Sequence, residues 1–159
     1  MTGVVHALIG SAAASALGLE NSLEVAGAIV GSLVPDIDEP GSTVGRLVPG
    51  SSIGRAGRVI VGGVLCWLGI SRGVVWMLVV GLVACLTGFL RHRGMTHSIV
   101  GLAAVGLLIR ALALPVWRGF LLGYALHLIA DACTPQGIPV AWPCRRRFRL
   151  TKAFTGGLR

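Results

Sequence analysis

Apolar residues in this chain gather into six runs that are separated by short polar stretches. Few charged residues interrupt a run, so each run predicts a helix that is apolar over most of its surface. The pattern therefore indicates an all-α fold. The six apolar segments cover residues 4–17, 25–34, 59–70, 73–90, 99–114 and 119–133.

The lengths of these segments indicate how they relate to a bilayer. About 20 apolar residues are needed to cross the hydrocarbon core, so we expect the short first two segments to form a tilted or re-entrant hairpin. A continuous helix over 59–90 would be about 48 Å long, which exceeds a core of about 30 Å. We therefore expect a turn at Arg72, within "SRG". The polar stretch 35–58, rich in proline and glycine, is expected to be a loop.

Composition supports a membrane protein. Hydrophobic residues make up 54% of the chain and charged residues 13%, whereas about 25% of the residues of a soluble domain are charged. The chain therefore lacks the polar surface to face water on all sides. We expect a polytopic membrane bundle of about six helical segments, in contact with membrane lipid.

The positions of lysine and arginine predict how the segments are oriented. If the six segments alternate across the membrane, eleven of the 14 basic residues fall on the side that holds both termini. Basic residues favour the cytoplasmic side, so we expect cytoplasmic N- and C-termini. We divide the chain into a membrane-embedded domain, 1–144, and a basic cytoplasmic tail, 145–159. The formal charge of +8 then reflects the membrane, and no nucleic-acid partner is expected.

Histidines and aspartates are concentrated on the predicted cytoplasmic side. "HLIAD" places His127 and Asp131 four residues apart, on one face of a helix, a spacing at which helices present pairs of metal ligands. "PDIDE" offers Asp36 and Asp38, and His6 lies near the start of the first segment. A mixed set of histidines and aspartates suits zinc first, with manganese or iron as alternatives, and carboxylates can bridge two ions.

The polar sequence "RHRGMTHS" lies between two apolar segments on the same predicted side. We expect His97 to be a metal ligand, and we assign His92 and Arg93 as candidate catalytic residues, with His92 either a general acid or a further ligand. A guanidinium group presents a planar fork to phosphate, so Arg91 and Arg93 could bind a phosphate. They could equally anchor the loop at the membrane. Groups expected to orient the histidines or to contact substrate are Arg91, Thr96, Ser98 and Thr134.

These blocks together resemble a known family. "LVPDIDEP", "RHRGMTHS", "HLIADACTPQGIPVAWP" and "RRRFRL" follow His6 in this order. The combination is similar to the YdjM-like family of bacterial inner-membrane proteins, which are described as membrane-bound metal-dependent hydrolases. The resemblance extends over nearly the whole chain and implies a location in the bacterial inner membrane. It also implies a metal site whose ligands are His6, Asp36, Asp38, His97, His127 and Asp131.

The leading hypothesis is a metal-dependent hydrolase with its site at the cytoplasmic membrane face. One or two divalent ions would activate water and polarise the scissile group. A site at this depth favours a phosphoester or other ester of a lipid or lipid-linked substrate. The alternative is a membrane protein that binds metal without catalysis, as an ion transporter or a sensor. A third hypothesis is a membrane anchor for a cytoplasmic partner, in which the metal is structural.

Overall fold

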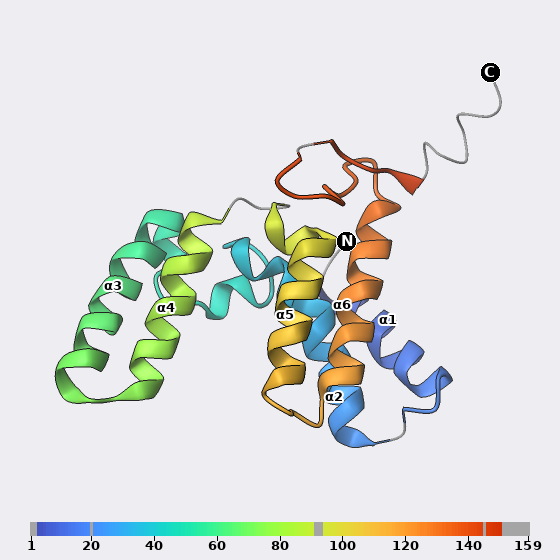
Figure 1. Cartoon of the computed structure of the whole chain (residues 1–159). Helices are drawn as coiled ribbons and strands as arrows, with labels where there is room; N and C mark the ends of the chain where they lie inside the picture. The colour runs from blue at the N-terminus through green and yellow to red at the C-terminus, as the bar shows by residue number, and fades with distance from the viewer. Residues whose placement is uncertain (1–2, 20, 91–93, 145, 151–159) are drawn as a thin grey trace. The chain divides into compact units, whose positions relative to one another are not determined.

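The computed structural model describes residues 3–19, 21–90, 94–144 and 146–150. Over these residues the regular structure is six α-helices and four short 3-10 helices, without a β-strand. One isolated antiparallel bridge pairs Ile138 with Phe148. The expected all-α fold is confirmed. The α-helices are α1 (Gly3–Ala16), α2 (Ser22–Leu33), α3 (Gly54–Arg72), α4 (Val75–Phe89), α5 (Ile99–Ala111) and α6 (Trp117–Ala132), as Figure 1 shows.

Each α-helix corresponds to one of the six apolar segments, with boundaries that differ by a few residues. The prediction of a loop over 35–58 is wrong. This stretch contains most of η1 (Val34–Asp38), all of η2 (Gly45–Leu47) and η3 (Ser51–Ile53), and the first turn of α3. A fourth 3-10 helix, η4 (Met95–His97), precedes α5.

A buried arginine explains why the stretch 35–58 is ordered. The side chain of Arg58 is fully buried, and its terminal nitrogens donate to the carbonyl oxygens of Ile37, at 2.8 Å, and Gly45, at 2.7 Å. The hydroxyl of Ser42 donates to the carbonyl of Asp36 at 2.6 Å and accepts from the N–H of Gly45 at 2.8 Å. These bonds satisfy backbone groups that an open loop would leave to water. The short 3-10 turns are therefore held by side chains distant in sequence.

The expected break between the third and fourth apolar segments is confirmed. α3 ends at Arg72, and Gly73 follows with a φ of 66°, in the left-handed region. The N–H of Val74 then donates to the carbonyl of Gly69 at 2.9 Å, which closes the end of the helix. Glycine reaches this backbone conformation without the steric cost that a Cβ would add. The sequence "SRG" therefore ends one helix and permits the next to run back beside it.

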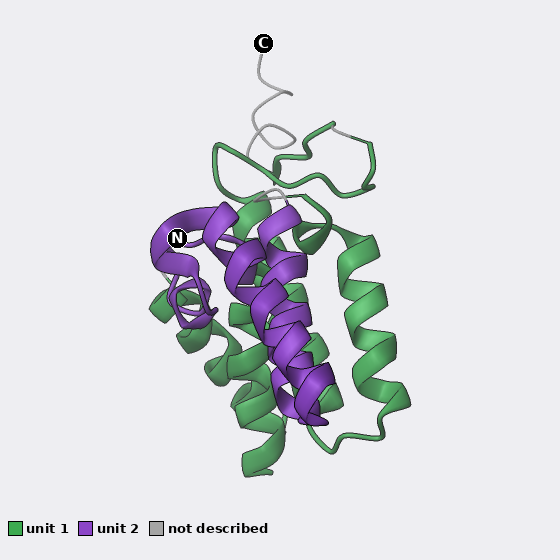
Figure 2. Ribbon diagram, turned by 90° about the vertical axis from the view of Figure 1, so that its left-hand side faces the viewer, with its two compact units in different colours: residues 1–35, 93–159 green, residues 36–92 purple. Residues whose placement is uncertain are grey.

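The described chain divides into two compact units, shown in Figure 2. Unit 1 comprises Met1–Pro35 and Arg93–Arg159, and it contains α1, α2, α5 and α6. Unit 2 comprises Asp36–His92 and contains α3 and α4. The apolar pattern of the sequence does not indicate this division, because the runs of both units are alike in composition.

Unit 1 is built around very close helix contacts at small residues. A Cβ added to Gly10 of α1 would lie 2.8 Å from the carbonyl oxygen of Ala28 in α2, and a Cβ added to Gly123 of α6 would overlap the same oxygen. The backbones of α1 and α6 therefore both approach α2 at Ala28. Such contacts at small residues are how helices associate in a lipid environment.

The other face of α6 carries the buried apolar core of unit 1. Phe120, Tyr124 and Leu128 follow one another at helical spacing and are at most 5% exposed. Leu102 and Val105 of α5, together with residues from other elements, pack against this row. α6 therefore contacts α2 through glycines and α5 through larger side chains, and it also contacts α1, so it is the central helix of its unit.

Unit 2 is a helical hairpin with the same kind of close contact. A Cβ added to Gly81 of α4 would lie 2.7 Å from the carbonyl oxygen of Gly62 in α3. Beside these glycines the thiols of Cys66 and Cys85 donate to the carbonyls of Leu78, at 3.8 Å, and Val59, at 3.6 Å. All four cysteines of the chain are free in the described structure, and this pair serves as small packing residues.

Within the described residues, one helical stretch is long and apolar enough to cross a membrane. It covers Ser51–Arg72 and has 22 residues. The shorter apolar helices are Gly3–Ala16, Val75–Phe89 and Ile99–Ala111. The multi-pass arrangement, the cytoplasmic termini and the division at residue 144 stay predictions.

Replacing Gly123 with alanine is expected to destabilise unit 1, because the new Cβ would push α6 away from the carbonyl of Ala28. Overpacking of this kind costs about 1–3 kcal/mol. Denaturant titration in detergent micelles, followed by helical circular dichroism, measures the loss. Gly63→Ala is the matched control, since its Cβ meets no atom within 4 Å, and a gain in helix propensity of about 0.5–1 kcal/mol is expected there. An equal loss in both variants would contradict this packing.

Replacing Arg58 with glutamine is expected to lower the free energy of unfolding by about 2–4 kcal/mol, because two buried carbonyls lose their donor. The same titration measures the change. Arg55→Gln removes an equal charge from an exposed position of α3 and should stay within about 0.5 kcal/mol of the parent protein. If the two variants unfold alike, Arg58 does not hold the stretch 35–58.

Candidate metal centre

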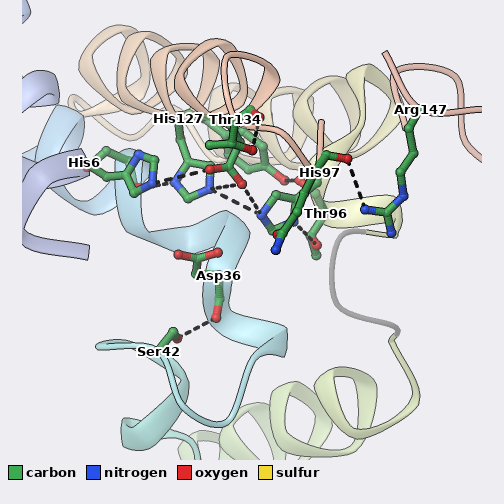
Figure 3. Close-up of polar contacts among 12 residues, drawn as sticks. His6, Asp36, Ser42, Thr96, His97, His127, Thr134 and Arg147 are labelled. Carbon is green, nitrogen blue, oxygen red and sulfur yellow. Dashed lines mark hydrogen bonds and ion pairs between the residues drawn. The ribbon is translucent and has the colours of Figure 1, made fainter. Parts of the chain in front are cut away.

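Three histidines and one aspartate meet in the interior of unit 1, although they come from distant parts of the sequence. His6 belongs to α1, His97 to η4, and His127 and Asp131 to α6. Each is at most 2% exposed. Figure 3 shows the three labelled histidines in one row, with a dashed contact between His97 and His127. The i, i+4 spacing in α6 turns His127 and Asp131 to the same side, as the sequence predicts.

The imidazole Nε2 atoms of all three histidines face the carboxylate of Asp131. Its Oδ1 lies 3.7 Å from Nε2 of His6, and its Oδ2 lies 3.5 Å from Nε2 of His97 and 3.9 Å from Nε2 of His127. The Nε2 atoms of His97 and His127 are 3.3 Å apart. Two nitrogens bound tetrahedrally to one zinc ion stand about 3.4 Å apart. The spacing of His97, His127 and Asp131 therefore fits the coordination shell of a single ion.

A hydrogen bond fixes which nitrogen of His127 is available to a metal. Its Nδ1 lies 2.6 Å from the carbonyl oxygen of Ser32 in α2. A carbonyl only accepts, so Nδ1 carries the proton, and in the neutral ring Nε2 has a free lone pair. Metal-bound histidines are usually held in this way, by a second partner on the ring nitrogen that does not bind the ion. The Nε2 lone pair of His127 is directed toward His97 and Asp131.

His97 is held by two contacts of the neighbouring residue Thr96. The hydroxyl of Thr96 lies 3.2 Å from Nδ1 of His97. The carbonyl of Thr96 accepts from the buried hydroxyl of Tyr124, in α6, at 2.6 Å. Tyr124 precedes His127 by three residues, so one face of α6 both offers ligands and positions His97.

The remaining member of the group, His6, stacks on His127. The two ring centroids are 3.9 Å apart and the planes differ by 23°. His97 meets His127 edge to face, with centroids 5.2 Å apart. His6 therefore approaches Oδ1 of Asp131, while His97 and His127 approach Oδ2. This arrangement gives the carboxylate two separate sides on which an ion could bind.

The other predicted ligands, Asp36 and Asp38, lie in η1 and belong to unit 2. The backbone at Asp36 is fixed by the hydroxyl of Ser42, a contact drawn in Figure 3, and Asp38 is fully buried. Their participation in the same metal site stays a prediction. His92, Arg91 and Arg93 lie outside the described residues, and their predicted roles likewise stay predictions.

The predicted hydroxyl groups have different partners. Thr96 contacts a histidine of the group, as described above. Ser98 caps α5, since its hydroxyl accepts from the N–H of Gly101 at 3.1 Å and donates to the carbonyl of Met95 at 2.6 Å. Thr134 donates to the backbone carbonyl of Asp131 at 2.7 Å and so closes the end of α6. The last two therefore support the helix ends that carry the group.

The sequence does not predict two features of the site, the hydroxyl of Tyr124 and the carbonyl of Ser32. Tyr124 carries a signal that could have been used, because a tyrosine three residues before His127 lies on the same helical face. The carbonyl of Ser32 carries none, since every residue has a carbonyl and only the packing of α2 against α6 selects this one. In the described residues the group thus offers three imidazoles and one carboxylate, a donor set that suits zinc.

Similar proteins are found in several bacteria. "Inner membrane protein YdjM" of Escherichia coli (strain K12) and that of Shigella flexneri are each 45% identical to this chain over 69 residues, which cover 37% of this chain and 34% of each relative. The chain thus spans about a third of the length of these two proteins. "Uncharacterized protein YvsG" of Bacillus subtilis (strain 168) is 29% identical over 157 residues, covering 94% of this chain and 78% of that protein. No solved structure matches.

A family model shows where the chain belongs. The model, described as YdjM inner membrane protein, matches residues 1–158. The match includes all six α-helices and every residue of the metal-binding group. The resemblance noted in the sequence is therefore confirmed, and the chain belongs to the YdjM family of inner membrane proteins.

Proposed function

We propose that this chain is a metal-dependent hydrolase of the bacterial inner membrane, acting on a phosphoester or other ester of a lipid or lipid-linked substrate. Family membership supports the membrane location. The observation that carries the proposal is the oriented Nε2 of His127, directed at His97 and Asp131 by the bond to Ser32. A histidine buried only for packing would not need a second imidazole and a carboxylate within 4 Å of its Nε2.

His97, His127 and Asp131 hold the ion in this proposal, because their ligand atoms all lie within 4.8 Å of one another. A divalent ion at this position supplies an activated water and polarises the scissile ester. Zinc fits the nitrogen-rich donor set best, and manganese or iron are alternatives. The chain's part is to hold these side chains in position and to bury them away from bulk water.

His6 has a distinct part in the proposal. It faces the other oxygen of Asp131, so it would serve as a ligand for a second ion or as a general base. Asp36 and Asp38 would complete a second ion's ligands. His92 and Arg93 would act as general acid and phosphate clamp, with Arg91 beside them.

A second candidate function is metal binding without catalysis, as in a transporter or sensor. The burial of the group favours it, since the side chains of His6, His97, His127 and Asp131 are at most 3% exposed. A substrate would have to reach an ion held by side chains that are almost fully buried. Both candidate functions require a bound metal, but only the hydrolase turns over an ester. A turnover assay therefore separates them.

The first expectation is that the purified protein retains about one or two divalent ions per chain. His127→Ala and Asp131→Ala should each weaken metal binding by more than about tenfold, because each removes a ligand. Elemental analysis by mass spectrometry, after dialysis against buffered zinc, measures the content. Glu24→Gln is the control, because Glu24 lies in α2 outside the group. A protein without metal, or variants that retain it fully, would exclude the proposed site.

The second expectation concerns turnover. Protein reconstituted in lipid nanodiscs with zinc or manganese should release phosphate from phosphatidic acid or an isoprenoid phosphate, or nitrophenol from bis(p-nitrophenyl) phosphate. EDTA should abolish the activity and added metal should restore it. Asp131→Asn should lower kcat by about 100-fold or more, while circular dichroism stays unchanged. Full metal occupancy with no turnover on any of these esters would leave the non-catalytic candidate and reject the hydrolase.

A further inference from the structure

Two arginines share one tryptophan at the turn between α5 and α6. Arg110 lies in the last turn of α5, and Trp117 and Arg118 begin α6. The guanidinium carbon of Arg110 is 5.2 Å from the centroid of the Trp117 ring, and that of Arg118 is 5.5 Å from it. Both arginines are exposed. The indole therefore gathers two positive charges at one point of unit 1.

Within the described part of the chain, no ion pair balances the charges of this cluster. Over the residues that the structure describes, neither Arg110 nor Arg118 forms an ion pair within 4 Å. The backbone of Glu24 adjoins the start of α6 at Gly119, but its carboxylate makes no such pair with Arg118. Each cation–π contact at an exposed site stabilises by about 0.5–1 kcal/mol. The ring holds the two guanidinium groups in place and leaves their N–H donors available to an anion.

An apolar surface adjoins these donors. Leu107, Leu108 and Leu112 of α5 and the following turn are 68%, 57% and 59% exposed. In an inner membrane protein this surface faces acyl chains. A double positive charge at the end of such a surface matches the chemistry of an acidic phospholipid, whose phosphate is linked through glycerol to two acyl chains.

We propose that Arg110, Trp117 and Arg118 form a binding site for the phosphate headgroup of an acidic phospholipid. The guanidinium groups donate to the phosphate oxygens, and arginine suits this role because its planar fork can bind two oxygens at once. The acyl chains lie along the exposed leucines of α5. The site is separate in sequence from the residues of the metal centre and does not depend on the proposed hydrolysis.

The test compares lipids that differ in headgroup alone. Full-length protein in a mild detergent is titrated with phosphatidylglycerol or phosphatidylcholine of the same acyl chains, and native mass spectrometry counts the lipids bound. Phosphatidylglycerol should bind about tenfold more tightly than phosphatidylcholine. The double variant Arg110→Gln, Arg118→Gln should lose most of this preference, and Arg110→Lys, Arg118→Lys should retain only part of it, because lysine keeps the charge without the fork.

A matched control accounts for general charge. Arg55→Gln, Arg72→Gln removes two exposed arginines of unit 2 and should leave the preference unchanged. Equal loss in the two double variants, or no headgroup preference in the parent protein, would overturn the proposal. Inorganic phosphate at millimolar concentration is the third arm, and if it displaces phosphatidylglycerol completely, the site is one for free phosphate and the lipid assignment is wrong. Circular dichroism confirms that each variant is folded before titration.

Discussion

The hydrogen bond from the imidazole of His127 to the carbonyl of Ser32 connects the packing of unit 1 with its chemistry. It needs the backbones of α2 and α6 to lie nearly in contact, and the glycine at position 123 permits this approach. In turn the bond sets the tautomer of His127 and directs its Nε2, as an acceptor, toward His97 and Asp131. The small residues of these helices therefore determine both how closely they pack and how the imidazole of His127 is oriented.

The helices of this chain could be read from its sequence because length and charge restrict the choices. A continuous helix over the third and fourth segments would be too long for a bilayer, and Gly73 supplies the turn where it is needed. The ordered turns of 35–58 could not be read in this way. They depend on Arg58, whose bonds to Ile37 and Gly45 cross 21 and 13 positions of the sequence. From the sequence alone, Arg58 indicates only another basic residue on the predicted cytoplasmic side.

The site was predictable where its residues share a helix and less so elsewhere. The spacing of His127 and Asp131 indicates one face directly, whereas the approach of His6 and His97 follows only from the assumption that like residues gather on one membrane side. Backbone partners such as the carbonyl of Ser32 have no distinct sequence signal. The sequence also carries no signal that Asp36 and Asp38 belong to the second compact unit, because the two units are defined by contacts between residues in the folded chain.

The wide separation of the ligands along the chain has a consequence for biosynthesis. His6 is translated before His127 and Asp131, which lie 121 and 125 residues further along the chain. The Nε2 atoms of His6 and His127 can meet at one carboxylate only after α6 has packed against α1. The complete group therefore cannot form on a nascent or truncated chain. Metal acquisition would then be a late event in assembly, available only to molecules whose helices have already packed.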